Sequence, residues 1–469
     1  MEFFFALFFL LFYYLRPQDW VPGLSGVELI KPIIGLWVFF LLAARSRPSP
    51  LKGWLRTPHD WVVHIYLGYI VFFGDASITE VLPFLAFYVL TLQSVNTWPR
   101  LLGYLKFWTY ALVMIAALGV LSTVGIDPTH AQDNYFTQLG RLAIGTWLHD
   151  NPNALGHSIV VAIPAAYLIF AWKGNAIGRI IVFPAIAAIV FYCAWLTQSK
   201  GSYVVGGLLV VITLILGKPW WIQLATLVIA LTVGVSALSF LPRMEDMSDL
   251  GSDEGVQGRL LAWEMAKTVE QNNHTGIGWR QFIAQIPWQE GGQTIIVPKA
   301  THSSYVQIGA DLGRYGLFLY LAGLWCAFHT LIVFRSSDSI EERCRRILII
   351  LLIANAISGW MINRQYHTEY FLLIAASAAL HRLKKAEEVL PEPDKAESRS
   401  PDAAITHAPF WGLAQRIHSA SPAPAFTLSA RGNGQVEKFW NRFGFLDLLC
   451  STGLTILTFW TWDYVLKNL

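Results

Sequence analysis

Long, uninterrupted apolar blocks recur along residues 1–385, and they constrain the fold of this chain more than any other feature. A helix needs about 20 mostly apolar residues to cross the hydrocarbon core of a bilayer. A segment in that core must satisfy its own backbone hydrogen bonds, which a helix does. The sequence therefore predicts an all-α, polytopic membrane protein with about twelve transmembrane helices. They are expected at residues 3–15, 28–44, 60–74, 79–95, 101–121, 153–172, 178–196, 202–217, 220–241, 303–334, 347–362 and 368–381.

Composition excludes several other classes of protein. Only 14% of the residues are charged, against about 25% in an ordinary soluble domain. The net charge of +3 and the lack of a basic stripe interleaved with aromatic residues give no reason to expect a nucleic-acid partner. The four cysteines form no C-x-x-C pair, so neither a disulfide framework nor a zinc site is indicated.

Lysine and arginine residues are concentrated in every second loop between the apolar blocks. The positive-inside rule places such loops in the cytoplasm. The alternation stays in phase through the predicted helices, so both ends of the core are expected in the cytoplasm. Two of the remaining, outward-facing loops are long, at residues 122–152 and 242–302. Residues 242–302 are predicted to form an external loop domain between helices 9 and 10, where function is most easily built.

The chain divides into three further parts by composition. Residues 1–385 form the predicted transmembrane core, and their first apolar run lacks the basic start of a signal peptide, so it is expected to be retained. Residues 386–440 are rich in Pro, Glu, Ser and Ala and are predicted to be a disordered cytoplasmic linker. Residues 441–469 carry a last apolar block, which is either a thirteenth span or an amphipathic surface helix.

Outward-facing cations are exceptions to the charge rule, and each needs a reason to be there. Lys200 stands at an external corner between two apolar blocks, where a lysine can simply extend to the interface. Arg259 opens a predicted amphipathic helix in the external loop, and its planar guanidinium suits a bidentate contact to phosphate. The structural alternative is a surface pair with Glu254 or Glu264. Three further external cations are second-rank candidates: Arg280, Arg314 and Arg141.

His302 stands where the long external loop re-enters the membrane, in Thr301-His302-Ser303-Ser304-Tyr305. An imidazole with a pKa of about 6.5 is a natural general base for a sugar hydroxyl. Taken alone, a histidine at an interface is more often structural. Tyr305 could line a sugar path, although packing is the commoner use of such a residue.

Other chemistries find less support in the sequence. The acidic run of residues 245–254 could hold a divalent cation, but its spacing fits no Ca²⁺-loop pattern and favours a solvated surface. Neither a P-loop, nor G-x-S-x-G, nor H-E-x-x-H occurs. ATPase, serine hydrolase and zinc protease functions are therefore not indicated.

The order of these features resembles the O-antigen ligase and O-antigen polymerase superfamily of bacterial membrane glycosyltransferases. The resemblance covers about residues 150–320 and rests on short motifs in a fixed order. They are Asn151-Pro152-Asn153-Ala154-Leu155-Gly156, Ser199-Lys200-Gly201, Gly258-Arg259 with Trp263, Gly276-Ile277-Gly278 with Phe282, and His302-Ser303-Ser304-Tyr305 followed by Asp311-Leu312-Gly313. In that family the first corner usually carries Arg. Lys200 keeps the charge there but gives up the bidentate fork.

The resemblance implies transfer of a glycan from undecaprenyl pyrophosphate to an acceptor hydroxyl on lipid A-core, a protein or another glycan. The reaction would be inverting, need neither metal nor nucleotide, and occur on the periplasmic face of the bacterial inner membrane. In this scheme His302 activates the acceptor, Arg259 and Lys200 hold the donor pyrophosphate, and Asn153 is a second-rank site residue.

The sequence leaves alternative functions open. An O-antigen or exopolysaccharide polymerase, which joins lipid-linked repeat units, would share all of these motifs. A secondary transporter is less favoured, because it would carry ionisable residues at mid-helix and broken helices in repeated halves, whereas the external cations here cluster at helix ends and loops. A non-catalytic flippase partner or scaffold is the remaining alternative.

Overall fold

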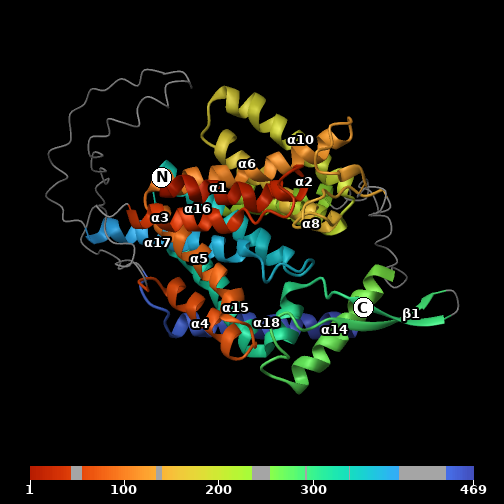
Figure 1. Ribbon diagram of the computed structural model, residues 1–469. Helices are drawn as coiled ribbons and strands as arrows, with labels where there is room; N and C mark the ends of the chain where they lie inside the picture. Colours follow the sequence, from red (N-terminus) through yellow and green to blue (C-terminus); the bar gives the residue numbers. More distant parts are fainter. Residues whose placement is uncertain are drawn as a thin grey trace, which may run out of the picture.

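The computed structural model describes residues 1–43, 55–133, 140–234, 254–290, 293–336, 338–389 and 440–468. Most of them are helical (Figure 1). The helices of the first half are α1 (Glu2–Leu15), α2 (Pro17–Trp20), α3 (Ile30–Ala43), α4 (Pro58–Phe72), α5 (Ile78–Ser94), α6 (Trp98–Ser122), α8 (Pro152–Ile159), α9 (Ala162–Ala166), α10 (Phe183–Thr197), α11 (Lys200–Ile215) and α12 (Trp220–Ile229). Those of the second half are α14 (Glu254–Asn272), α15 (Ser304–Val333), α16 (Ser339–Ser358), α17 (Thr368–Val389) and α18 (Phe445–Asn468). Three π-helical segments adjoin them, η2 (Tyr167–Ala171), η3 (Gly178–Val182) and η4 (Ala230–Gly234).

The helices follow the apolar blocks that the sequence shows. Each of the twelve predicted blocks overlaps a helix or a π-helical segment. Among the described residues, five segments are long and apolar enough to cross a membrane, namely Trp98–Ser122, Pro152–Ala171, Gly178–Thr197, Ser304–Val333 and Phe445–Asn468. The chain is therefore a multi-pass membrane protein, as predicted. That all twelve blocks cross the bilayer stays a prediction.

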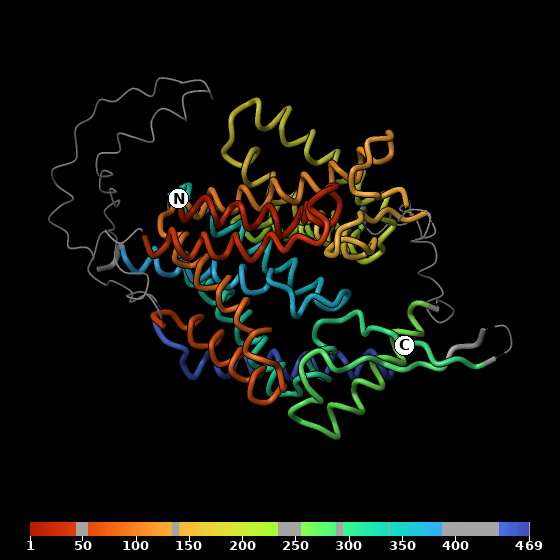
Figure 2. The backbone as a smooth tube through the Cα atoms, in the orientation of Figure 1, coloured from red at the N-terminus to blue at the C-terminus, as the bar shows by residue number. Residues whose placement is uncertain are grey.

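One two-stranded sheet adds to the predicted all-α fold. Strand β1 (Ala284–Glu290) pairs antiparallel with β2 (Gln293–Lys299), and Trp288 lies opposite Ile295. The sequence carries Gly-Gly between the two strands, a pair that favours tight hairpins, and β2 holds the β-branched run Thr-Ile-Ile-Val. This hairpin was not predicted from the sequence, and it extends beyond the helices in Figure 2.

Helix α15 packs against α4, α14, α16, α17 and α18. Its helical backbone is interrupted at Gly313, where φ is 65° and ψ is −169°. A Cβ atom at this position would lie 2.0 Å from the carbonyl oxygen of His274. Only glycine fits there, because the loop that follows α14 crosses the helix at this point. The same crossing is tied by the amide of Gly278, which donates to the carbonyl of Asp311 at 2.9 Å.

The last helix, α18, runs antiparallel to α15. Near its start, Asp447 accepts a hydrogen bond from Trp325 of α15 at 3.0 Å. Near its end, the ring of Trp462 packs on Gly309 of α15, and its indole donates to the carbonyl of Trp263 in α14 at 3.2 Å. Because α18 packs along α15, a candidate membrane span, from its start to its end, we favour a thirteenth span over a surface helix. Helix α18 also packs against α14.

The predicted linker at residues 386–440 lies almost wholly outside the described residues, although α17 continues to Val389. The first 12 residues of the predicted external loop domain, 242–253, also lie outside them, including most of the acidic run. Its described part consists of α14, a turn and the hairpin. In Figure 1 these elements lie at the end of the bundle away from the N-terminus.

Candidate active site

The loop that carries His302 links β2 to α15 and is anchored on both sides. Ser303 caps α15 by accepting a hydrogen bond from the amide of Val306. The amide of Ser304 donates to the carbonyl of Gly359 at 2.6 Å. His302 itself has a φ of 50°, in the left-handed region that non-glycine residues rarely adopt. Such backbone strain persists only where the surroundings enforce it, and it clusters at functional sites.

The connector between α16 and α17, residues 359–367, is the platform for this loop. The hydroxyl of Ser304 donates to the carbonyl of Ile362 at 2.8 Å and accepts from the amide of Arg364 at 2.9 Å. The hydroxyl of Thr301 donates to the side-chain oxygen of Asn363 at 3.0 Å. The residues on both sides of His302 are therefore fixed by hydrogen bonds to the connector.

Helix α14 brings Arg259 toward His302. The indole of Trp263, one helical turn after Arg259, donates to the carbonyl of Thr301 at 2.8 Å. Residues four apart share a helix face, so this bond turns the face that carries Arg259 toward the loop. Burial, together with the positive charges of Arg259 and Lys299, lowers the pKa of His302 to about 4. His302 is consequently neutral at pH 7 and able to accept a proton.

Lys200 begins α11, at a corner that rests on the same connector. A Cβ atom at Gly201 would lie 2.8 Å from the sulfur of Met361 and 2.9 Å from Nε2 of His157. Only a residue without a side chain allows this close packing. The imidazole of His157 shares a hydrogen bond with Ser358 at 2.9 Å. The Lys200 corner and the His302 loop therefore rest on the same connector, and the helix face that carries Arg259 is turned toward that loop.

The second-rank residues have mainly structural partners. Arg141 donates to the side chain of Asn153 at 2.8 Å and to the carbonyl of Thr197 at 3.2 Å, which ties the loop before α8 to the end of α10. Arg314 forms an ion pair with the buried Glu270 at 2.9 Å. The hydroxyl of Tyr305 donates to the carbonyl of Ala356 at 2.6 Å. These four candidates hold elements together, and we leave them out of the site proposed below.

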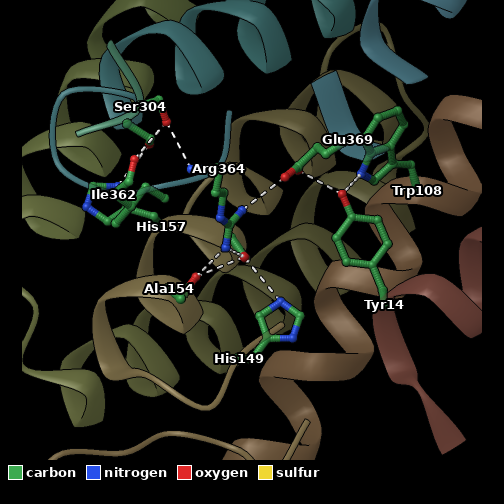
Figure 3. Close-up of polar contacts among 11 residues, drawn as sticks. Tyr14, Trp108, His149, Ala154, His157, Ser304, Ile362, Arg364 and Glu369 are labelled. Atoms are coloured by element: carbon green, nitrogen blue, oxygen red, sulfur yellow. Dashed lines mark hydrogen bonds and ion pairs between the residues drawn. The ribbon is translucent and has the colours of Figure 1, made fainter. Parts of the chain in front are cut away.

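Arg364 and Glu369, a largely buried pair at the connector, were not predicted from the sequence. Arg364 is buried and forms an ion pair with Glu369 at 3.1 Å, and its guanidinium also donates to the carbonyl of Ala154 and to the hydroxyl of Ser158 (Figure 3). A signal was available, because Arg364 is one more cation in a predicted outward-facing loop. The sequence could not show which residues Arg364 contacts.

The buried network continues from Glu369 to the first helix. Glu369 accepts a hydrogen bond from the hydroxyl of Tyr14 at 2.8 Å, and this hydroxyl accepts from the indole of Trp108 at 2.6 Å (Figure 3). Between this network and Ser304 lies a polar cavity of about 30 Å³, room for one or two water molecules. The network links α1, α6, α8 and α17 to the connector that carries the His302 loop.

A larger, open pocket lies beside the His302 loop. It has a volume of about 270 Å³ and contains no acidic side chain among its lining residues. Its polar lining consists of Arg280, Lys299, Gln307, Asn363, Gln365 and Tyr366. The guanidinium of Arg280 stacks on the ring of Trp279, 4.2 Å from its centroid.

The part of the chain that the structure describes contains no group of three or more His, Cys, Asp or Glu side chains able to hold a metal ion. The acidic residues considered in the sequence analysis lie at or beyond the edge of that part, because residues 235–253 are not described.

Comparison with known proteins bears on the region that holds the site. Residues 185–321 match the family described as O-antigen ligase, and this range includes Lys200, Arg259, Arg280, Lys299 and His302. No curated protein sequence matches the chain. The match covers the corner before α11, α14, the hairpin and the first half of α15. It confirms the resemblance drawn from the motifs: residues 185–321 of this multi-pass membrane protein are similar to the O-antigen ligase family.

Proposed function

We propose that this protein is a membrane glycosyltransferase that moves a glycan from undecaprenyl pyrophosphate to an acceptor hydroxyl. The observation that carries the proposal is a neutral imidazole with two cations beside it. His302 has a pKa of about 4 because of burial, Arg259 and Lys299. The imidazole is unprotonated at pH 7, so its lone pair is free to take the proton of a hydroxyl. An anionic pyrophosphate beside Arg259 would offset the charges that lower its pKa and bring the base closer to the working pH.

The reaction follows from these roles. His302 takes the proton of the acceptor hydroxyl, and the oxygen forms a bond to the anomeric carbon of the donor sugar. The bond from this carbon to the pyrophosphate oxygen breaks, and undecaprenyl pyrophosphate leaves with the electron pair. Attack opposite the leaving group inverts the configuration. Arg259 and Lys200 stabilise the charge on the leaving pyrophosphate, so that the proposal requires neither metal nor nucleotide.

The arrangement of the bundle supports an active site on the periplasmic face of the inner membrane. Arg100, in a loop predicted to be cytoplasmic, bonds Glu2 at the start of α1 at 3.0 Å. Figure 1 shows the N-terminus at the end of the bundle away from α14 and the hairpin. The positive-inside rule then assigns α14, the hairpin and the His302 loop to the outer side.

A ligase and a polymerase differ in what accumulates when the protein is absent. We favour the ligase, in accordance with the matching family description, and expect a deletion strain to accumulate free, lipid-linked polymer. Single lipid-linked repeat units would instead identify a polymerase. An unchanged profile of lipid-linked glycans would contradict both functions. The measurement is electrophoretic and mass-spectrometric profiling of extracted lipid-linked glycans, with a complemented strain as the control.

Arg259→Gln should change both donor use and pH dependence. Loss of one preorganised cation is expected to lower kcat/KM for the donor by about 100-fold or more. It should also raise the pKa of His302, now about 4, toward its ordinary value, because a like charge is removed. The base works in its neutral form, so the acidic limb of kcat/KM should move to higher pH. The check is a pH profile of transfer between pH 3.5 and 8.

Glu264→Gln is the matched control, since Glu264 is an exposed residue of the same helix. It should leave the acidic limb and the donor kinetics near those of the unaltered protein. If Arg259 serves only a surface ion pair with Glu264, the two variants will behave alike, and the donor-binding role is refuted.

A further inference from the structure

We infer that the pocket beside His302 binds the acceptor, and that its chemistry selects an anionic sugar, one that carries a carboxylate or a phosphate. That the ligand is the acceptor rests on the proposed function, whereas the negative charge of the ligand is inferred from the residues that line the pocket. At about 270 Å³ it is open and large enough for part of a glycan, and ten residues line it.

Charge is the first argument for an anionic ligand. Arg280 and Lys299 both line the pocket, and none of its lining residues is acidic. The carboxylates of Glu80 and Asp311 act on Arg280 from outside the lining. Asp311 is already engaged, because it accepts hydrogen bonds from the Tyr366 hydroxyl and the Phe282 amide, both at 2.7 Å. Two cations that face an open pocket without a carboxylate favour a negatively charged group.

An unsatisfied polar atom is the second argument. Gln365 lines the pocket and is 6% exposed, yet its side-chain oxygen has no hydrogen-bond partner among the described residues. A buried acceptor without a donor costs free energy. A rotation of the Gln365 side-chain amide toward the pocket would let a sugar hydroxyl supply that donor. Gln307 is already fixed by hydrogen bonds to the carbonyl of Phe282 at 2.8 Å and to Asp311 at 3.1 Å, so the amide wall of the pocket is preformed.

Rigidity is the third argument. Arg280 stacks on Trp279 and lies 5.7 Å from the ring centroid of Tyr366, while these two rings pack edge to face at 5.5 Å. Arg280 has a φ of 62°, which is left-handed like that of His302. The surroundings must enforce this backbone conformation at both positions, so the fold holds Arg280 and His302 in place.

The position of the pocket separates the acceptor from the donor. Lys299 and Ala300, just before His302 in the sequence, line the pocket, and Asn363 of its wall bonds Thr301. An acceptor in the pocket therefore lies beside the loop that carries the imidazole. Arg259 approaches the same loop on α14, whose Trp263 bonds the carbonyl of Thr301, and the Lys200 corner packs against His157 through Gly201. We assign the donor pyrophosphate to Arg259 and Lys200, which do not line the pocket.

The test measures binding of four small probes by the full-length protein in lipid nanodiscs, using proton saturation-transfer NMR for the sugars and phosphorus NMR line broadening for pyrophosphate. The probes are glucuronic acid, glucose 6-phosphate, glucose and inorganic pyrophosphate. Both anionic hexoses should bind at least tenfold more tightly than glucose, and whichever binds more tightly distinguishes a carboxylate from a phosphate ligand. Arg280→Gln should weaken the anionic hexoses at least tenfold and leave pyrophosphate unchanged, whereas Arg259→Gln should do the reverse.

Gln365→Leu should weaken all three hexoses, because it removes the hydroxyl acceptor without changing charge. Arg179→Gln, an exposed arginine on the segment before α10, is the control and should change nothing. Equal binding of glucose and the anionic hexoses, or loss of pyrophosphate on Arg280→Gln, would overturn the inference. The readout requires no catalysis, so a failure of the proposed glycan transfer is visible separately in the transfer assay.

Discussion

His302→Asn should lower the rate of glycan transfer by roughly 100-fold or more, as expected on loss of a general base. Asn is the most informative replacement, because His302 has a φ of 50° and Asn tolerates the left-handed region better than Ala. The amide also keeps polarity at the loop while it cannot take a proton at neutral pH. The measurement is single-turnover transfer from lipid-linked donor in nanodiscs, with folding checked by size-exclusion chromatography.

His130→Asn is the control for this experiment, because His130 also has a positive φ, of 53°. His130 lies in the loop after α6, is 68% exposed and lies 3.5 Å from the carboxylate of the nearby Asp133. It should retain full transfer activity. Equal activity in His302→Asn and the unaltered protein would sink the general-base assignment and leave His302 as a structural residue of the loop.

Arg364→Met should lower the free energy of unfolding by about 3–5 kcal/mol, since it leaves Glu369 buried without its cation. Arg364 and Glu369 form an ion pair at 3.1 Å, with side chains 9% and 13% exposed. The same substitution removes the bond from the connector to the carbonyl of Ala154. It is therefore expected to lower transfer as well as the midpoint of thermal unfolding in detergent.

The double variant Arg364→Met with Glu369→Gln tests the cause. The amide oxygen that Glu369→Gln introduces can still accept the hydrogen bond from the Tyr14 hydroxyl, which Glu369 accepts at 2.8 Å in the unaltered protein. With both charges gone, more than half of the lost stability should return, because the penalty comes from an unpaired buried charge. If the double variant is no more stable than Arg364→Met, the ion pair is not what holds the connector.

Much of the fold was accessible from the sequence because apolar blocks act locally. The predicted blocks coincide with helices, and the amphipathic segment around Arg259 forms α14. The hairpin was not predicted, because two strands of only seven residues each carry a shorter pattern than the long apolar blocks of the helices. Whether residues 443–466 cross the membrane could be addressed only from the contacts of Trp462 with Gly309 and of Asp447 with Trp325.

The candidate site, like the fold, was only partly predictable from the sequence. Lys200, Arg259 and His302 were selected from the sequence by charge placement and motif order, and they lie within the matched residues 185–321. Arg364 was overlooked because a lone arginine between two apolar blocks looks like any cation at an interface. Its bond to Ser158 joins residues 206 positions apart, and its amide bonds Ser304 across 60 positions.

The sequence by itself determined that this is a multi-pass helical membrane protein whose residues 185–321 resemble the O-antigen ligase family, since length, hydropathy and short motifs are properties of consecutive residues. Only the tertiary structure decided how the connector fixes the His302 loop, why the pKa of His302 falls to about 4, and where an open basic pocket lies. Those features depend on burial and on charges from separate helices. The physical reason is that electrostatic and packing energies depend on distances in space, which the order of residues does not specify.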